Sequence, residues 1–374
     1  MSLVGRLIID LDAIVANWRA LDALTAPHVE TAAVIKADAY GCGATQVGTA
    51  LTKAGARTFF VALPDEGASL RENLGPDPKI YILAGYPIPE PHSHPSATQS
   101  PLPVGGRLRE GALSARHFYA THTLRPILNS AVQAAAWFRD APEGPCAIQL
   151  DTGMNRLGME LAEFTSLGSL PASVRLIMSH LACADAPAHP QNPAQLAEFT
   201  RLTKPISDLP RSLAATAGIL LDADYHFDLT RVGIGLYGGW PFTAGRPAVT
   251  VHLPIIQIRD VAPGESVGYG ATWTAHRPSR IATLSSGYAD GLIRALGGNA
   301  TGYIGSQPAP FVGRVSMDLI TLDVTDCPTA QPGTLVEILG PHQTIDDLAA
   351  AASTIGHEIL TSLGTRYQRR YTGA

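Results

Sequence analysis

The sequence predicts an α/β fold with two domains: an N-terminal (β/α)8 TIM barrel over residues 1–240 and a C-terminal, mainly β domain over residues 241–374. Eight strand-then-helix units in the first two-thirds of the chain favour a closed parallel barrel over an open sheet. After "GLYGGWP", strand patterns and turn signals follow one another with almost no helix between them. The 374 residues also exceed the roughly 250 to 300 residues that a single hydrophobic core serves.

Each barrel strand is expected where a short apolar run ends at a turn or helix signal. The eight runs cover residues 31–36, 57–63, 79–83, 125–129, 146–151, 174–180, 212–216 and 226–234. Between them, "PDEGASLREN" (64–73), "SAVQAAAWFRD" (130–140) and "NPAQLAEFTRLTK" (192–204) space their apolar residues for one helix face. This alternation is what a parallel barrel requires.

Residues 85–111 interrupt the pattern with a segment rich in proline and serine that has no periodicity. Such a composition predicts a long surface loop or an inserted linker. Its histidines, His92 and His94, are metal ligands by type, but their spacing favours a solvated loop.

The second domain is expected to contain strands in four segments and one helix. The segments are 249–261, 279–289, 309–325 and 333–340. The helix is "TIDDLAAAASTIGHEILTSL" (344–363), which begins with Thr344 as an N-cap and carries two aspartates in its first turn.

Composition excludes several classes of protein. The formal charge is −5, without blocks of like charge, which argues against a nucleic-acid-binding surface. The four cysteines lie far apart with no C-x-x-C pair, so the sequence signals neither a metal site nor a disulfide framework and favours a reducing cytoplasm. Two aspartates interrupt the N-terminal apolar run, and no later segment reaches the roughly 18 apolar residues of a membrane span. We therefore expect a cytoplasmic protein.

Lys36 stands at the end of the first barrel strand, in "TAAVIKADAYGCGA". Desolvation lowers the pKa of a buried amine, so Lys36 could offer a neutral amine to a carbonyl compound in Schiff-base chemistry. Alternatively, the strand simply ends there and the ammonium reaches solvent along its own stem.

Other polar residues follow the later strands at the barrel end where such folds carry their chemistry. Asp151 and Arg156 follow the fifth strand, His180 ends the sixth, Thr216 ends the seventh, and Arg231 lies in the eighth. Each has a structural alternative: a helix cap for Asp151, a satisfied core histidine for His180, or an ion pair across the rim for Arg231. Together with a strand-end lysine and a glycine-rich turn, they favour a phosphorylated aldehyde cofactor, pyridoxal 5'-phosphate.

Seven motifs, "AAVIKADAYGCG", "LDTGMNRLG", "MSHLACADAP", "TRVGIGLYG", "SVGYGATW", "GYADG" and "GRVSMD", occur in the order seen in bacterial alanine racemases. The chain resembles this pyridoxal phosphate-dependent family from about residue 5 to its C-terminus. Only the segment at 85–111 looks foreign to it.

The resemblance implies two catalytic residues on opposite faces of the substrate α-carbon. Lys36 matches the lysine that holds the cofactor aldehyde and then acts as a base. Tyr269, in "SVGYGATW", matches the opposing acid/base, which the second domain of a partner subunit contributes. On spacing alone, that motif reads as a glycine-rich turn with a tyrosine at its edge.

The resemblance also implies how the cofactor ring is held. Arg231 matches the arginine at the pyridine nitrogen, where a permanently charged guanidinium disfavours ring protonation and so limits side reactions. His180 matches a histidine that orders this arginine and the tyrosine. Arg156 matches an arginine near the cofactor's phenolic oxygen and the substrate carboxylate.

Further residues match phosphate and substrate contacts. The phosphate matches are hydroxyl and backbone donors: Tyr40, Thr216, Gly233 and Ile234. Met317, through its backbone N–H, matches a contact to the substrate carboxylate, and Tyr288 matches a residue lining the entrance. Without the resemblance, core packing explains Met317. Asp318 is expected to support these contacts from behind.

Two positions depart from the family pattern. Many members carry a carbamylated lysine where this chain has Gln149, so no carbamate can form here. Whether the Gln149 amide holds Arg156 by a hydrogen bond instead stays open. Some members place a phosphate-binding tyrosine before the arginine that is Arg366 here, whereas this chain has Thr365. Whether Thr365 or Tyr367 helps to hold the phosphate stays open.

The resemblance therefore implies a homodimer with shared sites that interconverts L-alanine and D-alanine and supplies D-alanine for peptidoglycan. A serine or broad-specificity racemase is an alternative, because the fold and cofactor do not determine the side-chain pocket. A non-catalytic carrier of pyridoxal phosphate would not need the domain that bears Tyr269 and Met317. A decarboxylase is disfavoured by Arg231.

Overall fold

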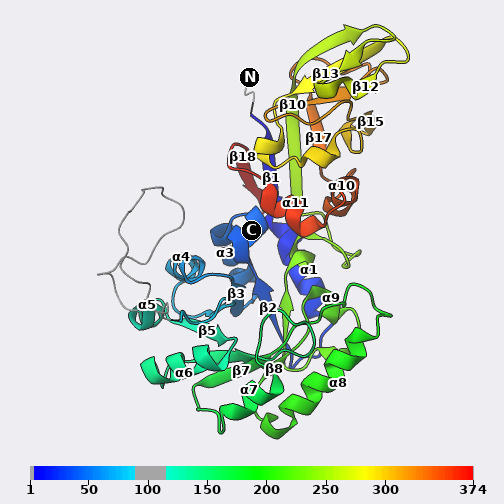
Figure 1. The fold of residues 1–374 in the computed structure, drawn as a ribbon. Helices are drawn as coiled ribbons and strands as arrows, with labels where there is room; N and C mark the ends of the chain where they lie inside the picture. Colours follow the sequence, from blue (N-terminus) through cyan, green and yellow to red (C-terminus); the bar gives the residue numbers. More distant parts are fainter. Residues whose placement is uncertain (1–3, 89–114, 374) are drawn as a thin grey trace, which may run out of the picture.

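The computed structural model describes residues 4–88 and 115–373. This part of the chain forms a parallel barrel and a second sheet that is mostly antiparallel, each built from eight strands (Figure 1). The segment with His92 and His94 lies outside the described residues. None of the helices in the described ranges has the length and apolar character of a membrane span.

The predicted barrel is confirmed, and each of its eight strands overlaps one of the expected runs. They are β2 (Glu30–Val34), β3 (Thr58–Val61), β4 (Lys79–Ile82), β5 (Leu124–Leu128), β6 (Cys146–Gln149), β7 (Val174–Met178), β8 (Arg211–Ser212) and β9 (Leu229–Val232). Neighbours pair in parallel in the order β8-β7-β6-β5-β4-β3-β2-β9. A bridge between Ala215 and Arg231, with the Arg231 N–H donating to the Ala214 carbonyl at 3.0 Å, brings the first and last strands of this path together.

Side chains fill the barrel, so it is a packed core and not a pore. The inner cluster takes residues from seven strands: Ala32, Phe60, Tyr81, Ile127, Ala147, Leu176, Met178 and Leu229. The outer faces of the strands pack on the surrounding helices in a second, larger cluster. The polar end of the barrel therefore stands on a rigid apolar base.

Helices cover the outside of the barrel (Figure 1). They include α1 (Leu11–Asp22), α3 (Ala44–Ala54), α4 (Pro64–Leu74), α5 (Ala115–Thr121), α6 (Ala131–Asp140), α7 (Leu161–Ser166), α8 (Gln191–Thr203) and α9 (Thr216–Ile219). The predicted starts have local causes: Pro64 occupies the first turn of α4, and the Ser130 hydroxyl accepts the Gln133 N–H at 3.2 Å.

The second sheet holds the strands expected after residue 241 together with both ends of the described chain. Its strands are β1 (Arg6–Asp10), β10 (Val249–Val261), β13 (Ser279–Leu284), β14 (Thr301–Ile304), β15 (Gln307–Pro310), β16 (Ile320–Asp323), β17 (Leu335–Leu339) and β18 (Gln368–Thr372). The short hairpin of β11 (Ser266–Val267) and β12 (Trp273–Thr274) forms its own two-stranded sheet.

Strand β1 is where the structure departs from the sequence-based division at residue 241. It pairs antiparallel with β10 and parallel with β18, so the first strand of the chain lies in the second sheet, whereas the division placed it with the barrel. Its apolar side chains, Leu7 and Ile9, are fully buried there. The chain enters the barrel only after this strand, through α1.

The prediction of a single helix at 344–363 is wrong, because the structure has two helices there, α10 (Ile345–Ala351) and α11 (Gly356–Ser362). The first begins as predicted, with the Thr344 hydroxyl accepting the Asp347 N–H. It ends because Ser353 adopts a left-handed conformation and the Thr354 N–H donates back to the Ala349 carbonyl at 2.9 Å. This is a Schellman turn with serine in the place usually taken by glycine.

Candidate active site

The barrel residues expected at the site follow the carboxyl ends of its strands. Lys36 and Tyr40 follow β2, His180 follows β7, Thr216 follows β8, and Arg231 lies in β9. In parallel sheets these ends face one side. Helix α11 of the second domain packs on the segment after β2 and so borders the site (Figure 1).

The segment after β2, α2 (Lys36–Gly41), is a left-handed helical turn. Ala37 to Tyr40 have φ between 52° and 57° and ψ between 37° and 52°. Residues other than glycine pay roughly 1–2 kcal/mol each for this conformation. Carboxylates hold the turn: Glu66 Oε1 accepts the Ala37 N–H at 2.7 Å, and Asp38 Oδ1 accepts the Ala44 N–H at 2.7 Å.

The second domain clamps the same turn from the other side. Arg369 in β18 donates to the Gly41 carbonyl at 2.5 Å and lies 3.8 Å from the Asp38 carboxylate. Gly41 has φ +79°, and a Cβ there would lie 2.8 Å from the Leu360 carbonyl oxygen of α11. The position of Lys36 thus depends on contacts from both domains.

Lys36 has the lowered pKa that its strand-end position predicts. Burial lowers the pKa of the amine most, and the positive charge of Arg156 lowers it further, while Glu66 acts in the opposite direction. The net shift increases the neutral, nucleophilic fraction of the amine.

Arg231 is buried, with 3% of its surface exposed, among neutral hydrogen-bond acceptors. Its Nη1 donates to Ser212 Oγ at 2.5 Å. Its Nη2 donates to the Ser179 and Leu213 carbonyls at 2.7 and 3.3 Å. Burial lowers the pKa of its guanidinium to about 10, which still leaves it charged at neutral pH. Among the described residues nothing accepts its Nε–H, so one donor remains for an acceptor atom in the site.

His180 accepts a hydrogen bond from this arginine. Its Nδ1 lies 3.3 Å from Nη2 of Arg231, and a guanidinium can only donate. Burial, followed by the charges of Arg231, Arg156 and Lys36, lowers the pKa of His180 to about 3. The ring is therefore neutral at physiological pH, with its proton on Nε2.

The expected phosphate residues form a cradle of neutral donors. The Gly233 and Gly235 N–H groups donate to Thr216 Oγ1 at 3.1 and 3.3 Å. A Cβ on Gly233 would lie 2.5 Å from the Tyr40 hydroxyl, so only glycine allows this approach. Tyr40 is buried, and within the described ranges its hydroxyl has no hydrogen-bond partner. Ile234 begins the 3-10 turn η3 (Ile234–Tyr237) beside it. Hydroxyl and backbone donors of this kind fit a phosphate dianion.

Arg156 lies near the site, and the question left open for Gln149 is answered, because its amide does not bond to Arg156. The Gln149 amide donates to the Leu157 carbonyl at 2.9 Å. Arg156 is exposed and makes no hydrogen bond or ion pair within the described part of the chain. Asp151 has a structural role in the loop that follows it, because its Oδ1 accepts the N–H groups of residues 153–155.

The residues expected from the second domain are exposed and stand apart from those of the barrel. Tyr269 is 73% exposed, Met317 54% and Tyr288 44%. Tyr269 lies in η4 (Tyr269–Ala271), between the two strands of the β11/β12 hairpin, which projects from the far end of the second domain (Figure 1). Within the described residues, no hydrogen bond or ring contact joins these three side chains to Lys36 or Arg231. A single chain therefore leaves the two expected groups of residues without contact between them.

The C-terminal residues left open by the sequence lie away from the cradle. The Tyr367 hydroxyl is 3.0 Å from Ser286 Oγ, within the second domain. Thr365 is exposed.

Sequence reasoning missed His357 in α11. Its ring centroid is 5.7 Å from that of Tyr40, and burial followed by the charge of Lys36 lowers its pKa. No spacing signal distinguishes this histidine from other residues of an amphipathic helix, because α11 reaches the site only through domain packing.

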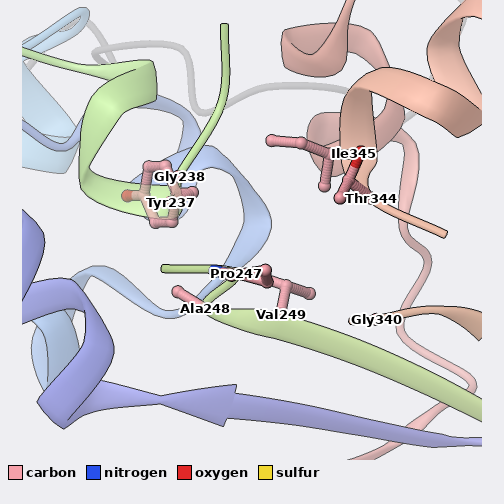
Figure 2. A pocket seen from close by; sticks show the side chains of 8 residues that line it. All are labelled: Tyr237, Gly238, Pro247, Ala248, Val249, Gly340, Thr344 and Ile345. Carbon is pink, nitrogen blue, oxygen red and sulfur yellow. The ribbon is translucent and has the colours of Figure 1, made fainter. Parts of the chain in front are cut away.

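A small cavity lies between η3 and the start of α10 (Figure 2). It is lined by Tyr237, Gly238, Pro247, Ala248, Val249, Gly340, Thr344 and Ile345. Its volume of about 10 Å³ suits about one water molecule, which excludes it as a substrate site.

A barrel that presents a lysine of lowered pKa beside a cradle of phosphate donors has the architecture of an enzyme that holds pyridoxal phosphate through that lysine. Two family models match the chain. The alanine racemase N-terminal domain matches residues 9–99 and 108–241, and the alanine racemase C-terminal domain matches residues 248–371. The chain belongs to the alanine racemase family, a family of pyridoxal phosphate-dependent isomerases.

Individual relatives agree over nearly the whole chain. An alanine racemase of Jannaschia sp. is 54% identical over 368 residues, covering 98% of this chain and 99% of that protein. One from Cereibacter sphaeroides is 52% identical over 367 residues, covering 98% and 97%.

Solved structures give the same result. The alanine racemase from Bartonella henselae with covalently bound pyridoxal phosphate superposes with a TM-score of 0.87 at 37% identity, covering 99% of both chains. The biosynthetic alanine racemase from Pseudomonas aeruginosa has a TM-score of 0.85 at 34% identity, again over 99% of both chains.

Proposed function

We propose that this chain interconverts L-alanine and D-alanine with pyridoxal phosphate held by Lys36. The observation that carries the proposal is the meeting of Lys36, His180 and Arg231 with the hydroxyl cradle at one end of the barrel. Membership of the alanine racemase family supports the same reaction. When bound, pyridoxal phosphate supplies an aldehyde that links covalently to amines and a ring that stabilises negative charge at the substrate α-carbon.

Lys36 and Tyr269 of the partner subunit divide the proton transfers. The lowered pKa of Lys36 suits an amine that takes and returns the α proton on one face of the substrate. Tyr269 of the partner subunit serves the opposite face. Its 73% exposure in a single chain is what a residue completed by a second subunit would show.

Arg231, His180 and the cradle orient the cofactor. The Nε–H of Arg231, for which the described residues offer no acceptor, suits the ring nitrogen. The guanidinium charge disfavours protonation of that nitrogen, which favours racemisation over decarboxylation. The neutral donors of Tyr40, Thr216, Gly233 and Ile234 suit the phosphate. Arg156 and the Met317 N–H suit the substrate carboxylate, with Tyr288 at the entrance.

The proposal includes a cytoplasmic homodimer whose D-alanine serves peptidoglycan. Each subunit would contribute a barrel to one site and Tyr269, Tyr288 and Met317 to the other. The domains would divide near residue 241; the family matches end at 241 and resume at 248, and β1 joins the second sheet by its pairing.

Circular dichroism of L-alanine incubated with the purified protein and pyridoxal phosphate tests the reaction, with L-serine alongside. We expect the alanine signal to fall to zero while the serine signal persists. Loss of both signals would indicate a broad-specificity racemase. An unchanged alanine signal in a protein that holds the cofactor would overturn the proposal in favour of another substrate or a carrier.

Lys36→Ala tests the attachment point. Removal of the amine should abolish the absorption of the lysine-bound cofactor, whereas Lys53→Ala, an exposed lysine in α3, should leave it unchanged. A Lys36→Ala protein with a normal spectrum would contradict the assignment.

A further inference from the structure

We propose that Arg366 is a positioning residue that holds Tyr288 and the Met317 N–H in place for the partner subunit's active site. This inference rests on the proposed function. It concerns a residue that sequence reasoning noted only as the neighbour of Thr365.

Arg366 binds Asp290 through two parallel hydrogen bonds. Its Nε donates to Asp290 Oδ1 at 2.6 Å and its Nη2 donates to Oδ2 at 2.8 Å. The Asp290 side chain is only 7% exposed, so water competes little for this carboxylate. A bidentate pair sets the orientation of both groups as well as their distance.

Asp290 in turn closes the turn that carries Tyr288. Its Oδ2 accepts the Gly287 N–H at 2.9 Å across η5 (Tyr288–Asp290). Its backbone carbonyl accepts the Gly364 N–H at 3.0 Å. The segment before β18 is therefore bound to this turn by both side chain and backbone.

The third contact of Arg366 reaches the loop that carries Met317. Its Nη1 donates to Asp318 Oδ1 at 2.8 Å. The two loops also touch directly, because the Tyr288 N–H donates to the Ser316 carbonyl and the Ala289 N–H to the Met317 carbonyl, both at 3.0 Å. One guanidinium thus ties together the two loops that the proposed function places at the partner's substrate.

The positive charge of Arg366 also bears on how the Met317 N–H would bind a substrate carboxylate. Within the described residues the Met317 N–H has no acceptor, so it remains open to a carboxylate. Asp318 is the next residue in the chain, and Arg366 joins it to Asp290. Without Arg366 these two carboxylates would lose their shared counter-ion, and their negative charge near the Met317 N–H would disfavour a substrate carboxylate there.

Steady-state kinetics of Arg366→Gln tests this role. We expect KM for alanine to rise roughly tenfold with kcat changed much less, because the contacts hold the substrate and not the reacting proton. Arg366→Lys keeps the positive charge but cannot form the bidentate pair with Asp290. Its KM for alanine should therefore lie between those of Arg366→Gln and the wild type. Arg370→Gln is the matched control, since this arginine is exposed and, within the described residues, its side chain bonds only to Gln368 Oε1, at 3.3 Å.

Two further measurements separate positioning from a folding defect. Hydrogen exchange of the cofactor-free protein should accelerate in residues 286–291 and 315–319 of Arg366→Gln and stay unchanged in the barrel strands. Asp318→Asn keeps the Asp290 pair and should raise KM less than Arg366→Gln does. An unchanged KM in Arg366→Gln, or equal acceleration of exchange throughout the chain, would overturn the proposal.

A mixed dimer tests whether Arg366 acts across the interface. In a dimer of one Lys36→Ala chain and one Arg366→Gln chain, the only site with a lysine would face the loops of the chain with an intact Arg366. Its KM should return to the wild-type value. A KM that stays raised would place the effect within one chain and overturn the assignment, whereas failure of the wild type to racemise alanine would instead contradict the proposed function.

Discussion

Burial and positive charge act in the same direction on His180, which gives the protein a testable pH dependence. The ordinary histidine pKa is 6.5, and the folded protein lowers it to about 3. Between these values the unfolded chain binds a proton that the folded chain does not. Stability should therefore be lost as pH falls below 6.5, by at most about 1.4 kcal/mol per pH unit from this residue.

Urea unfolding at pH 7 and pH 4.5 measures the effect. His357 also has a lowered pKa, so the comparison needs the His180→Gln variant, which keeps a hydrogen-bonding side chain but does not titrate. We expect a smaller loss between the two pH values in His180→Gln than in the wild type. Equal losses would show that the His180 pKa does not contribute.

Tyr269 should act on one enantiomer more than on the other. If it serves the face of the substrate opposite Lys36, Tyr269→Phe should slow proton exchange from L-alanine more than from D-alanine. Exchange of the α hydrogen in deuterated water, followed by proton NMR for each enantiomer, measures this. Equal slowing for both would argue against bases on opposite faces.

At the scale of single residues, the sequence predicts which side chains lie near one another. It does not predict their hydrogen-bond partners as well. Lys36, His180 and Arg231 are predictable because parallel strands end on one side of a barrel. The partner of Gln149 is not, since the choice between the Leu157 carbonyl and the Arg156 guanidinium depends on a loop conformation that no periodicity encodes.

At the scale of elements, the left-handed turn after β2 makes the position of Lys36 depend on Gly41. Gly41→Ala would place a Cβ 2.8 Å from the Leu360 carbonyl oxygen at φ +79°. We expect a stability loss of about 2–4 kcal/mol and weaker cofactor binding, because Lys36 begins the same turn.

Gly298→Ala is the matched control for this prediction. Gly298 has the same φ as Gly41, +79°, with nothing within 4 Å of its Cβ position, so it isolates the backbone strain from the contact with α11. Its cost should be about 1–2 kcal/mol, and cofactor binding should be unaffected. Urea midpoints and titration with pyridoxal phosphate measure both; similar losses in the two variants would show that α11 does not constrain the turn.

Strands and helices with a clear apolar pattern were predictable from the sequence. Features that depend on the unusual backbone conformation of one or a few residues were not. The eight barrel strands follow from apolar runs bounded by turn and helix signals. The break at Ser353 was missed because alanine, serine and threonine there show no helix-stop signal. The left-handed turn was missed because three of its four left-handed residues, Ala37, Ala39 and Tyr40, rarely adopt that conformation.

In the whole molecule, the C-terminal segment supports both halves of the proposed site. Arg369 in β18 clamps the turn that carries Lys36, while Arg366, three residues earlier, clamps the loops that carry Tyr288 and Met317. The C-terminal segment thus connects the barrel half of one site to the contributed half of another. Sequence patterns do not show this connection, because it depends on β18 pairing with β1 from the other end of the chain.

Because Lys36 and Tyr269 lie apart in one chain, mixing two variants tests the proposed dimer. Lys36→Ala and Tyr269→Phe homodimers should each lack one of the two acid/base groups at both sites. In a mixed dimer, one site would carry both substitutions and the other would combine an intact Lys36 with an intact Tyr269. Random exchange of subunits should therefore restore roughly a quarter of wild-type activity, since half of the dimers are mixed and each has one intact site.

Subunit exchange must be shown independently, for example by mass spectrometry of dimers carrying tags of different mass. Mixing Lys36→Ala with an equal amount of wild-type protein provides the control. About half of wild-type activity should remain in either geometry, which would show that a Lys36→Ala chain does not inactivate its partner. Exchange without recovery in the Lys36→Ala and Tyr269→Phe mixture would then place both residues in a single chain. Recovery would show that they meet across the interface, which is why a lone chain leaves Tyr269 exposed at the far end of its second domain.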